Sequence, residues 1–181
     1  MMKIKNYLRA LAVIIATFVS FSANAQSIEG CWDYETKIEG HSVGIRMLID
    51  KSRQAILLTA AEIPNDDVGV VTIALISAPT AVKTPDDKLI IEPDPKKVTL
   101  KVTEVEWSDK IKVAIEDDPS IDKTMTEEIE KSLQENCAEM AKDMMFSGEF
   151  TIVDITQTEL VLKDEDGEQM TFVKSDPDSG Q

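Results

Sequence analysis

The segment Lys97–Thr103, with the sequence KVTLKVT, alternates polar and apolar residues strictly. A two-residue period places the valines and the leucine on one face of an extended chain, which is typical of a strand with one buried face. After Thr103 the phase slips, because Val105 and Trp107 carry the apolar face onward. This slip predicts a β-bulge or a bend near Glu104.

The same alternation recurs along much of the chain. Other candidate strands carry apolar side chains at Ile45, Met47 and Ile49, at Ile111, Val113 and Ile115, at Phe150 and Ile152, at Leu160 and Leu162, and at Met170 and Phe172. Turn residues separate these runs, and Asp166-Gly167 is a strong hairpin signal. Many short strands without alternating helices predict a mainly β, antiparallel fold, either a barrel or a sandwich. We expect the barrel, because closure removes exposed strand edges.

One segment, residues 124–145, breaks the strand pattern. It contains neither Gly nor Pro, and its apolar residues recur at helical spacing. We expect one long amphipathic helix here, inserted before the last three strands, with a capping box formed by Thr124 and Glu127. The strand predicted at 70–76 is apolar on both faces and needs a cover. We therefore expect the helix to pack outside the sheet there; the alternative is a lid across the barrel mouth.

The first 25 residues have the pattern of a secretory signal peptide. Lys3, Lys5 and Arg9 form a basic head, residues 11–21 are largely apolar, and 23–25 form a small-x-small cleavage site. The apolar run is too short for an ordinary membrane span, and no second candidate follows. We expect a soluble chain exported to the periplasm or the extracellular space. Residues 26–174 would form one barrel domain and 175–181 a disordered tail.

The charge of the chain is strongly negative. The formal net charge is −15, and removal of the three basic residues of the signal peptide gives −15 − 3 = −18. Such a surface repels the phosphates of nucleic acids and anionic lipid headgroups. The composition therefore argues against a nucleic-acid partner, and simple solubility explains the charge.

Candidate catalytic and metal-binding groups are sparse. The one histidine, His41, lies in a predicted turn, so neither an imidazole zinc site nor a catalytic triad is indicated. Two acidic groups carry oxygen ligands of the kind that calcium prefers: Asp164, Asp166 and Glu168, and Glu116, Asp117, Asp118 and Asp122. The first does not fit an EF-hand loop and reads as a hairpin turn, and the second has no recognisable spacing. We expect no catalytic residues, no metal and no cofactor.

Two cysteines, Cys31 and Cys137, follow the predicted signal peptide. In an oxidising compartment they could form one disulfide, which would close a loop of about 106 residues and stabilise the fold by ~4–5 kcal/mol. The alternative is two buried thiols that act as small apolar groups. Spacing along the sequence does not decide between them.

A family resemblance rests on several short motifs. Gly30-Cys31-Trp32 opens the first strand and resembles the Gly-x-Trp pattern of lipocalins. The segments 87–92, 160–162 and 166–172 also look like small lipocalin-like proteins secreted by Bacteroidetes-type bacteria. The resemblance implies an up-and-down barrel with one open end, in which the tryptophan packs at the closed end against a basic residue of the last strand. Here that residue would be Lys174, where an arginine is usual.

The resemblance also implies a function. A lipocalin-like barrel would bind a small apolar or amphipathic ligand in its interior, and the sequence does not assign the ligand-binding residues. The alternative is a filled barrel that serves as a protein-interaction module in the envelope. A packed interior would favour the second hypothesis, and the methionines of segment 124–145 suit either a ligand site or a core.

Overall fold

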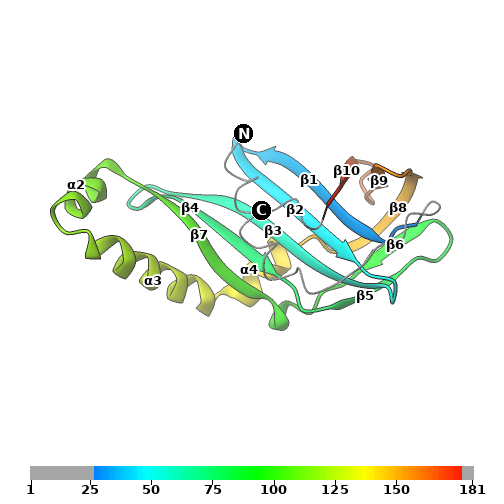
Figure 1. Ribbon diagram of the computed structural model, residues 1–181, viewed down its shortest axis with the longest axis horizontal. Coiled ribbons are helices and arrows are strands. Elements are labelled where there is room, and N and C mark those ends of the chain that lie inside the picture. Colours follow the sequence, from blue (N-terminus) through cyan, green and yellow to red (C-terminus); the bar gives the residue numbers. More distant parts are fainter. Residues whose placement is uncertain (1–26, 177–181) are drawn as a thin grey trace.

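The computed structural model describes residues 27–176, so the predicted signal peptide lies outside the described residues, as do residues 177–181 of the predicted tail. The elements of the described chain appear in Figure 1. In order they are β1 Gly30–Ile38, β2 His41–Ile49, β3 Gln54–Asn65, β4 Gly69–Ile76, β5 Thr80–Lys83, β6 Lys88–Ile91, the 3-10 turn η1 Pro95–Lys97, β7 Thr99–Trp107, α2 Asp109–Asp117, α3 Ser120–Glu135, α4 Cys137–Met144, β8 Gly148–Ile155, β9 Glu159–Lys163 and β10 Gln169–Ser175.

Eight strands close into an antiparallel barrel, which confirms the expected mainly β architecture. The ring runs β1, β2, β3, β5, β6, β8, β9 and β10, and β10 pairs with β1 to complete it. Neighbouring strands of the ring therefore follow one another in chain order when β4 and β7, which lie outside the ring, are left out. The closing junction is short, because β10 pairs only with Cys31, Trp32 and Asp33 of β1.

β4 and β7 lie outside the ring. The start of β3 pairs with β5 through Gln54 and Ala55, whereas its later part, from Leu58 to Asn65, pairs with β4. β7 then pairs with β4 and ends the sheet. We call β4, β7 and the later part of β3 the wing; it extends to the left of the barrel in Figure 1.

The predicted irregularity in β7 is confirmed. Thr72 pairs with Glu104 and the next residue, Ile73, pairs with Val102, so Thr103 is the extra residue of a β-bulge. The Thr103 hydroxyl donates a hydrogen bond of 3.1 Å to the carbonyl oxygen of Thr72. The bulge shifts the phase of the strand and keeps both halves of β7 apolar toward the core.

The predicted strand at Ile111–Ile115 is wrong, because these residues belong to α2. The helix begins after Ser108, whose carbonyl oxygen accepts bonds from the amides of Ile111 and Lys112. Ile111 and Ile115 are four residues apart, so a helix also places them on one face. Val113, between them, is 61% exposed, which agrees with a helix turned partly to solvent.

The structure has two helices in place of the single long helix expected over 124–145. The helical segment begins at Ser120 and breaks at Asn136, which separates α3 from α4. The Asp118 carboxylate accepts bonds from the amide and hydroxyl of Ser120 at the start of α3. Thr124 is inside the helix and donates to the carbonyl oxygen of Ser120, so the expected capping box is wrong.

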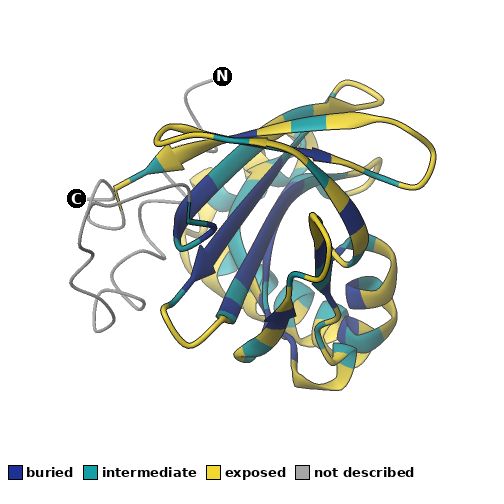
Figure 2. Ribbon diagram, turned by 90° about the vertical axis from the view of Figure 1, so that its right-hand side faces the viewer, coloured by how far each residue is buried: buried dark blue, intermediate teal, exposed yellow. Residues whose placement is uncertain are grey.

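The helices pack on the wing face that continues the barrel interior. Ile129 and Leu133 of α3 join the same apolar core as Ile73 and Leu75 of β4. The other face of the wing carries a separate apolar cluster formed by Leu58, Ala60, Ala74 and Ile76. The helices thus cover the opposite face of β4 from the one we expected. Figure 2 shows the buried residues concentrated along the strands. Among the described helices, α4 contributes the buried residues Cys137 and Ala141, whereas α2 and α3 contribute none.

In the part of the chain that the structure describes, no helix has the length and apolar character needed to cross a membrane.

Candidate functional site

The barrel interior is filled by side chains of the barrel itself. All eight ring strands contribute to one apolar core: Trp32, Met47, Ile49, Leu57, Val82, Leu89, Ile91, Phe150, Leu160, Leu162 and Phe172. Most of these side chains have no solvent exposure. Protein interiors at this burial are close-packed, so the space that a lipocalin-like fold could offer to a ligand is occupied by the chain.

The segment that joins α4 to β8 enters this core. Phe146 stacks on Phe150 with ring centroids 4.4 Å apart, and it packs edge-on against Phe172 at 5.3 Å. Tyr34 of β1 lies 5.3 Å from Phe172 on the other side. The four aromatic side chains form a cluster, which we call the plug. Phe146 belongs to the plug although it lies in the α4–β8 connection and not on a barrel strand.

Three methionines pack against the same core. Met140 and Met144 of α4 and Met170 of β10 are partly buried and pack against the core. Their side chains fill irregular gaps well, which agrees with a role in packing.

One polar group interrupts the apolar interior. Thr59 on β3 pairs with Ile45 and Leu75, both of which face the core, and it is 1% exposed. Its hydroxyl has no hydrogen-bond partner. A buried hydroxyl without a partner costs roughly 1–3 kcal/mol.

The structure brings together the three residues that the lipocalin resemblance singled out. Trp32 is fully buried and its indole Nε1 donates a 2.8 Å bond to the carbonyl oxygen of Ile28. Lys174 pairs directly with Trp32 across β1 and β10, and its Nζ lies 5.0 Å from the ring centroid. The cation therefore lies against the buried ring of Trp32, within the range of a cation–π contact.

Gly30 makes this approach feasible. Its φ is +141°, a backbone conformation that side chains rarely adopt. A Cβ atom at this position would lie 2.8 Å from Cε of Lys174. The backbone angle therefore favours glycine at this position of the Gly-x-Trp motif, and a larger residue would also displace the end of the Lys174 side chain.

The outer surface of β1 to β4 carries a buried ion pair. Nε and Nη2 of Arg46 each donate a 2.7 Å bond to the carboxylate of Asp33. The side chains are 9% and 21% exposed. Burial alone would lower the pKa of Arg46, but the bonds to Asp33 outweigh it and the pKa is raised. Such a pair on an outer wall has less water around it than an ordinary surface salt bridge.

Strand register aligns small residues next to this pair. Gly44 pairs with Ala60, and Ala60 pairs with Ala74, so three small residues lie in one row across β2, β3 and β4. The neighbouring row contains Arg46, Leu58 and Ile76. We call the small residues together with Leu58 and Ile76 the outer trough.

The outer trough has an acidic rim on its other side. Glu62 pairs with Thr72, and Thr72 pairs with Glu104, in the row that follows the small residues. The carboxylate of Glu62 accepts a 3.0 Å bond from the amide of Ser42. An apolar strip is therefore flanked by carboxylates along one border.

Both cysteines are free and buried. Cys31 pairs with Leu48 and Ser175 near the outer trough, whereas Cys137 belongs to the core with its sulfur 3.5 Å from the carbonyl oxygen of Val98. This arrangement corresponds to the second alternative, two buried thiols. Burial raises the pKa of both thiols, which disfavours the reactive thiolate form.

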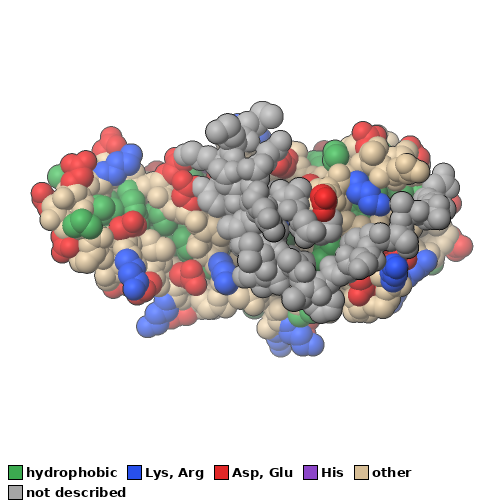
Figure 3. All heavy atoms as spheres, viewed as in Figure 1, with side chains coloured by type: hydrophobic (Ala, Val, Ile, Leu, Met, Phe, Trp, Pro, Cys, Tyr) green, Lys and Arg blue, Asp and Glu red, His purple; other side chains and the backbone are tan. Residues whose placement is uncertain are grey.

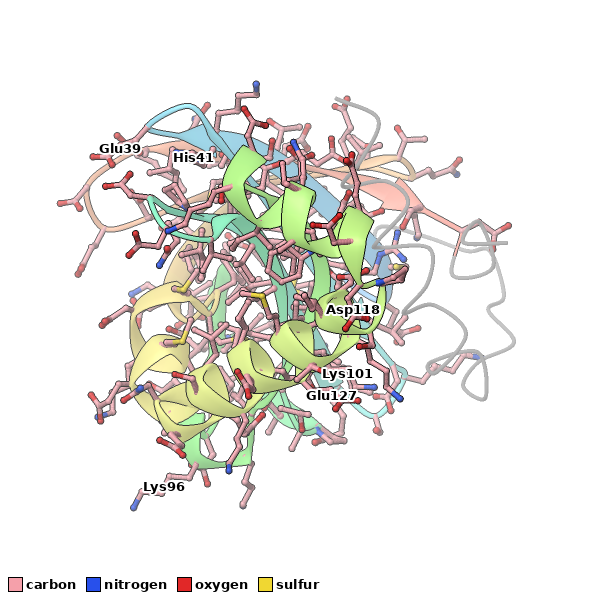
Figure 4. The ribbon with its side chains drawn as sticks, turned by 90° about the vertical axis from the view of Figure 1, so that its left-hand side faces the viewer. Glu39, His41, Lys96, Lys101, Asp118 and Glu127 are labelled. Carbon is pink, nitrogen blue, oxygen red and sulfur yellow. The ribbon has the colours of Figure 1, made fainter. Side chains whose placement is uncertain are left out.

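The acidic groups considered as calcium ligands have other partners. Asp164 accepts from the amide of Glu168 in the turn before β10, and Asp122 accepts a 2.9 Å bond from the indole of Trp107. Among residues 27–176, no group of three or more His, Cys, Asp or Glu side chains is placed to hold a metal ion. Figure 4 shows His41 well separated from Asp118 and Glu127 on the helical side.

The described surface has hollows, one of which lies beside the core residue Phe150. One, with a volume of about 470 Å³, is lined by Lys88, Ser147, Gly148, Glu149, Phe150, Thr151, Lys163, Asp164 and Glu165. Lys88 forms an ion pair with Glu149 there. On the face seen in Figure 3, acidic and basic side chains are interspersed at both ends of the described surface. This mixture of charges favours no single class of ligand.

Sequence reasoning missed the outer trough. Gly44, Ala60 and Ala74 come from three strands, and only the register between the strands brings them into one row. The available signal was the two-sided apolar character of 70–76, which indicated a covered outer face. A comparison with models of known protein families gives no match to this chain, and neither does a comparison with curated proteins.

Proposed function

We propose that this chain is an exported, non-enzymatic binding module that contacts a protein partner through the outer wall of a filled, lipocalin-like barrel. The filled interior carries the proposal. Every ring strand directs apolar side chains into one core, and Phe146 enters that core from the α4–β8 connection. A small ligand would have to displace these rings, whereas a protein partner needs only a surface.

The lipocalin-like part of the proposal rests on two observations. The ring strands follow chain order, and the Gly30, Trp32 and Lys174 cluster has the arrangement that the resemblance implies. These features concern the scaffold, so they leave the binding surface to be argued separately.

The outer trough is the best candidate for the binding surface. It places a small apolar cluster beside the partly buried Arg46–Asp33 ion pair on the outer face of the sheet, and apolar residues next to polar groups are a common composition of protein–protein contacts. Small residues at its centre allow another chain to approach the backbone of the sheet closely.

A pull-down from the envelope fraction of the native host tests this proposal. The tagged protein is expected to enrich one partner at near-stoichiometric yield, and Ala74→Glu is expected to abolish the enrichment because it places a charge in the apolar strip. Val113→Glu, on the exposed face of α2, is the matched control and keeps the partner. Equal recovery with both variants, or no enrichment by the wild-type protein, contradicts the proposal.

A small apolar ligand is the second candidate, and one observation favours it. The core that contains the plug also has partly buried Met140, Met144 and Met170 packed against it, whose flexible side chains could rearrange around a ligand. Titration with a fluorescent fatty acid tests this alternative. Saturable one-to-one uptake supports it, and the absence of saturable uptake supports the filled barrel.

A further inference from the structure

The later part of β1 has an open edge. β10 pairs with β1 only as far as Asp33, so Tyr34–Ile38 has no strand beside it on that side among the described residues. We call this the β1 edge. Glu35 and Lys37 are exposed there, and Ile38 is 59% exposed. An open edge presents backbone N–H and C=O groups that can pair with another strand.

The hairpin between β1 and β2 decides which backbone groups point to the β1 edge. Its two-residue turn, 39–40, has positive φ at both positions, as in a type I′ hairpin. Ile38 precedes this turn and pairs with His41, so it forms a hydrogen-bonded pair with β2. Hydrogen-bonded pairs alternate along an antiparallel ladder. Glu35 and Lys37 therefore direct their backbone N–H and C=O groups to the open side.

We propose that the β1 edge pairs with the same edge of a second copy of the chain, antiparallel and with a two-fold axis at Thr36. The two barrels would then share one sheet that continues through their β1 strands. Self-pairing of one surface about a two-fold axis is the commonest way in which identical chains associate. The outer trough lies across β2, β3 and β4, so this pairing uses a different surface and goes beyond the proposed function.

The charges on the β1 edge select the register. Because Glu35 and Lys37 carry the outward-directed backbone groups, one of these two residues must face one of them in the second copy. With the axis at Glu35 or at Lys37, that residue would face its own copy, and like charges directly opposite each other are destabilising. With the axis at Thr36, Glu35 of each copy faces Lys37 of the other copy in a hydrogen-bonded pair. The β1 edge is therefore complementary to itself in this register.

The shape of the hairpin also fits this register. Tyr34 of each copy would face Ile38 of the other copy, which covers a side chain that is largely exposed in the single chain. After Ile38 the second copy turns at Glu39 and Gly40, so it does not need the space beside Asp33 that β10 occupies. Figure 4 shows Glu39 at the periphery of the molecule, where a second chain has access.

The open edge of β7, at the end of the sheet, is covered by the chain itself. β7 pairs only with β4, and α3 packs against β7. The carboxylate of Glu130 on α3 accepts a 3.2 Å hydrogen bond from the amide of Val102. Among residues 27–176, no side chain caps the outward amides of Glu35 and Lys37 in this way. The contrast favours the β1 edge as the one that takes a second strand.

Sedimentation velocity of the purified protein over a range of concentrations tests the pairing with charge variants. The wild type is expected to dimerise at physiological ionic strength, which screens the repulsion between chains of net charge −15. Glu35→Lys and Lys37→Glu each place like charges opposite each other in both pairs, so each should raise the dissociation constant by about tenfold or more. The double variant Glu35→Lys/Lys37→Glu exchanges the charges and should restore the wild-type constant.

Two outcomes of this experiment would overturn the proposal. A wild type that stays monomeric up to millimolar concentration excludes self-pairing and leaves the β1 edge to an extended segment of a different protein. A double variant that dimerises as weakly as the single variants, or single variants that dimerise like the wild type, excludes the register with the axis at Thr36.

A cross-link tests the register directly. Facing residues of a pair without hydrogen bonds have Cα atoms about 4.5 Å apart, which a disulfide can bridge. Thr36→Cys is therefore expected to give a covalent dimer on mild oxidation, read on a non-reducing gel. Ile38→Cys is the matched control, because Ile38 is exposed but lies about 14 Å from its own copy in this register. No covalent dimer of Thr36→Cys, or equal cross-linking of both variants, contradicts the proposal.

Discussion

Lys174 Nζ lies 5.0 Å above the ring of Trp32, directly across the junction of β1 and β10. This junction completes the ring. The contact between the lysine and the tryptophan therefore links the first and the last strand of the described chain. The contact combines a buried aromatic ring with an exposed cation, which is an arrangement that contributes to stability without burying a charge.

Removal of the cation should destabilise the barrel modestly. Lys174→Ala is expected to lower the free energy of unfolding by ~0.5–1 kcal/mol, as for an exposed cation–π contact. Lys174→Arg should retain or exceed wild-type stability, because a planar guanidinium can stack on the indole. Urea denaturation checks both variants, with Lys96→Ala in η1 as the control. Equal stability of Lys174→Ala and wild type would show that the contact contributes nothing.

Removal of the hydroxyl in the barrel interior should stabilise the fold. Thr59→Val keeps the shape of the side chain and removes a buried hydroxyl that has no hydrogen-bond partner. The expected gain is about 1 kcal/mol in the free energy of unfolding, measured by chemical denaturation. Thr171→Val, at an exposed position of β10, should change stability little. A loss of stability in Thr59→Val would mean that the hydroxyl has a partner in solution.

The two thiols should be unreactive in the folded protein. Cys31 and Cys137 are buried and free, and burial raises the pKa of each thiol. A maleimide reagent is expected to label neither cysteine under native conditions and both in denaturant, as read by intact mass. Reducing agent should not change the melting temperature. A mass lower by two hydrogens without reductant would show a disulfide and contradict this arrangement.

Stability should decrease at acid pH through Asp50. Its carboxylate accepts bonds from the amide of Gln54 and from the hydroxyl and amide of Ser52, and these bonds lower the pKa of Asp50. The Asp50 carboxyl group therefore binds a proton more weakly in the folded state than in the unfolded state. The ionised carboxylate stabilises the fold at neutral pH, and this contribution is lost as the pH falls below about 4.

Asp50→Asn tests this dependence. The variant is expected to be less stable at neutral pH and to lose less stability than the wild type between neutral and acid pH. Melting temperatures across the pH range measure the difference, and Asp66→Asn in the exposed β3–β4 loop is the control. Parallel pH profiles for wild type and Asp50→Asn would exclude the carboxylate as a contributor.

The sequence predicted most of the barrel because strand alternation is a local property. The slip after Thr103 identified the bulge in β7, since a single extra residue reverses the phase of the side chains. The segment at Ile111–Ile115 failed because its spacing fits both a strand and a helix. The break at Asn136 also left no signal, because the apolar stripe continues across it.

The wing and the outer trough could not be predicted from the sequence. β3 pairs with β5 at its start and with β4 later on, and this choice depends on contacts between distant residues. The contact between Trp32 and Lys174 was predicted only through a family resemblance, because the alternation of residues along one strand does not tell which residue of another strand lies beside it. Gly44, Ala60 and Ala74 had no such guide, and register alone aligns them.

The central claim is that the barrel interior is filled by the chain itself. Native mass spectrometry of the protein purified from its own host tests this claim most directly, because it retains noncovalent ligands. The account predicts a single species with the mass of the polypeptide alone. A reproducible adduct with the mass of one small apolar molecule, released on denaturation, would contradict it.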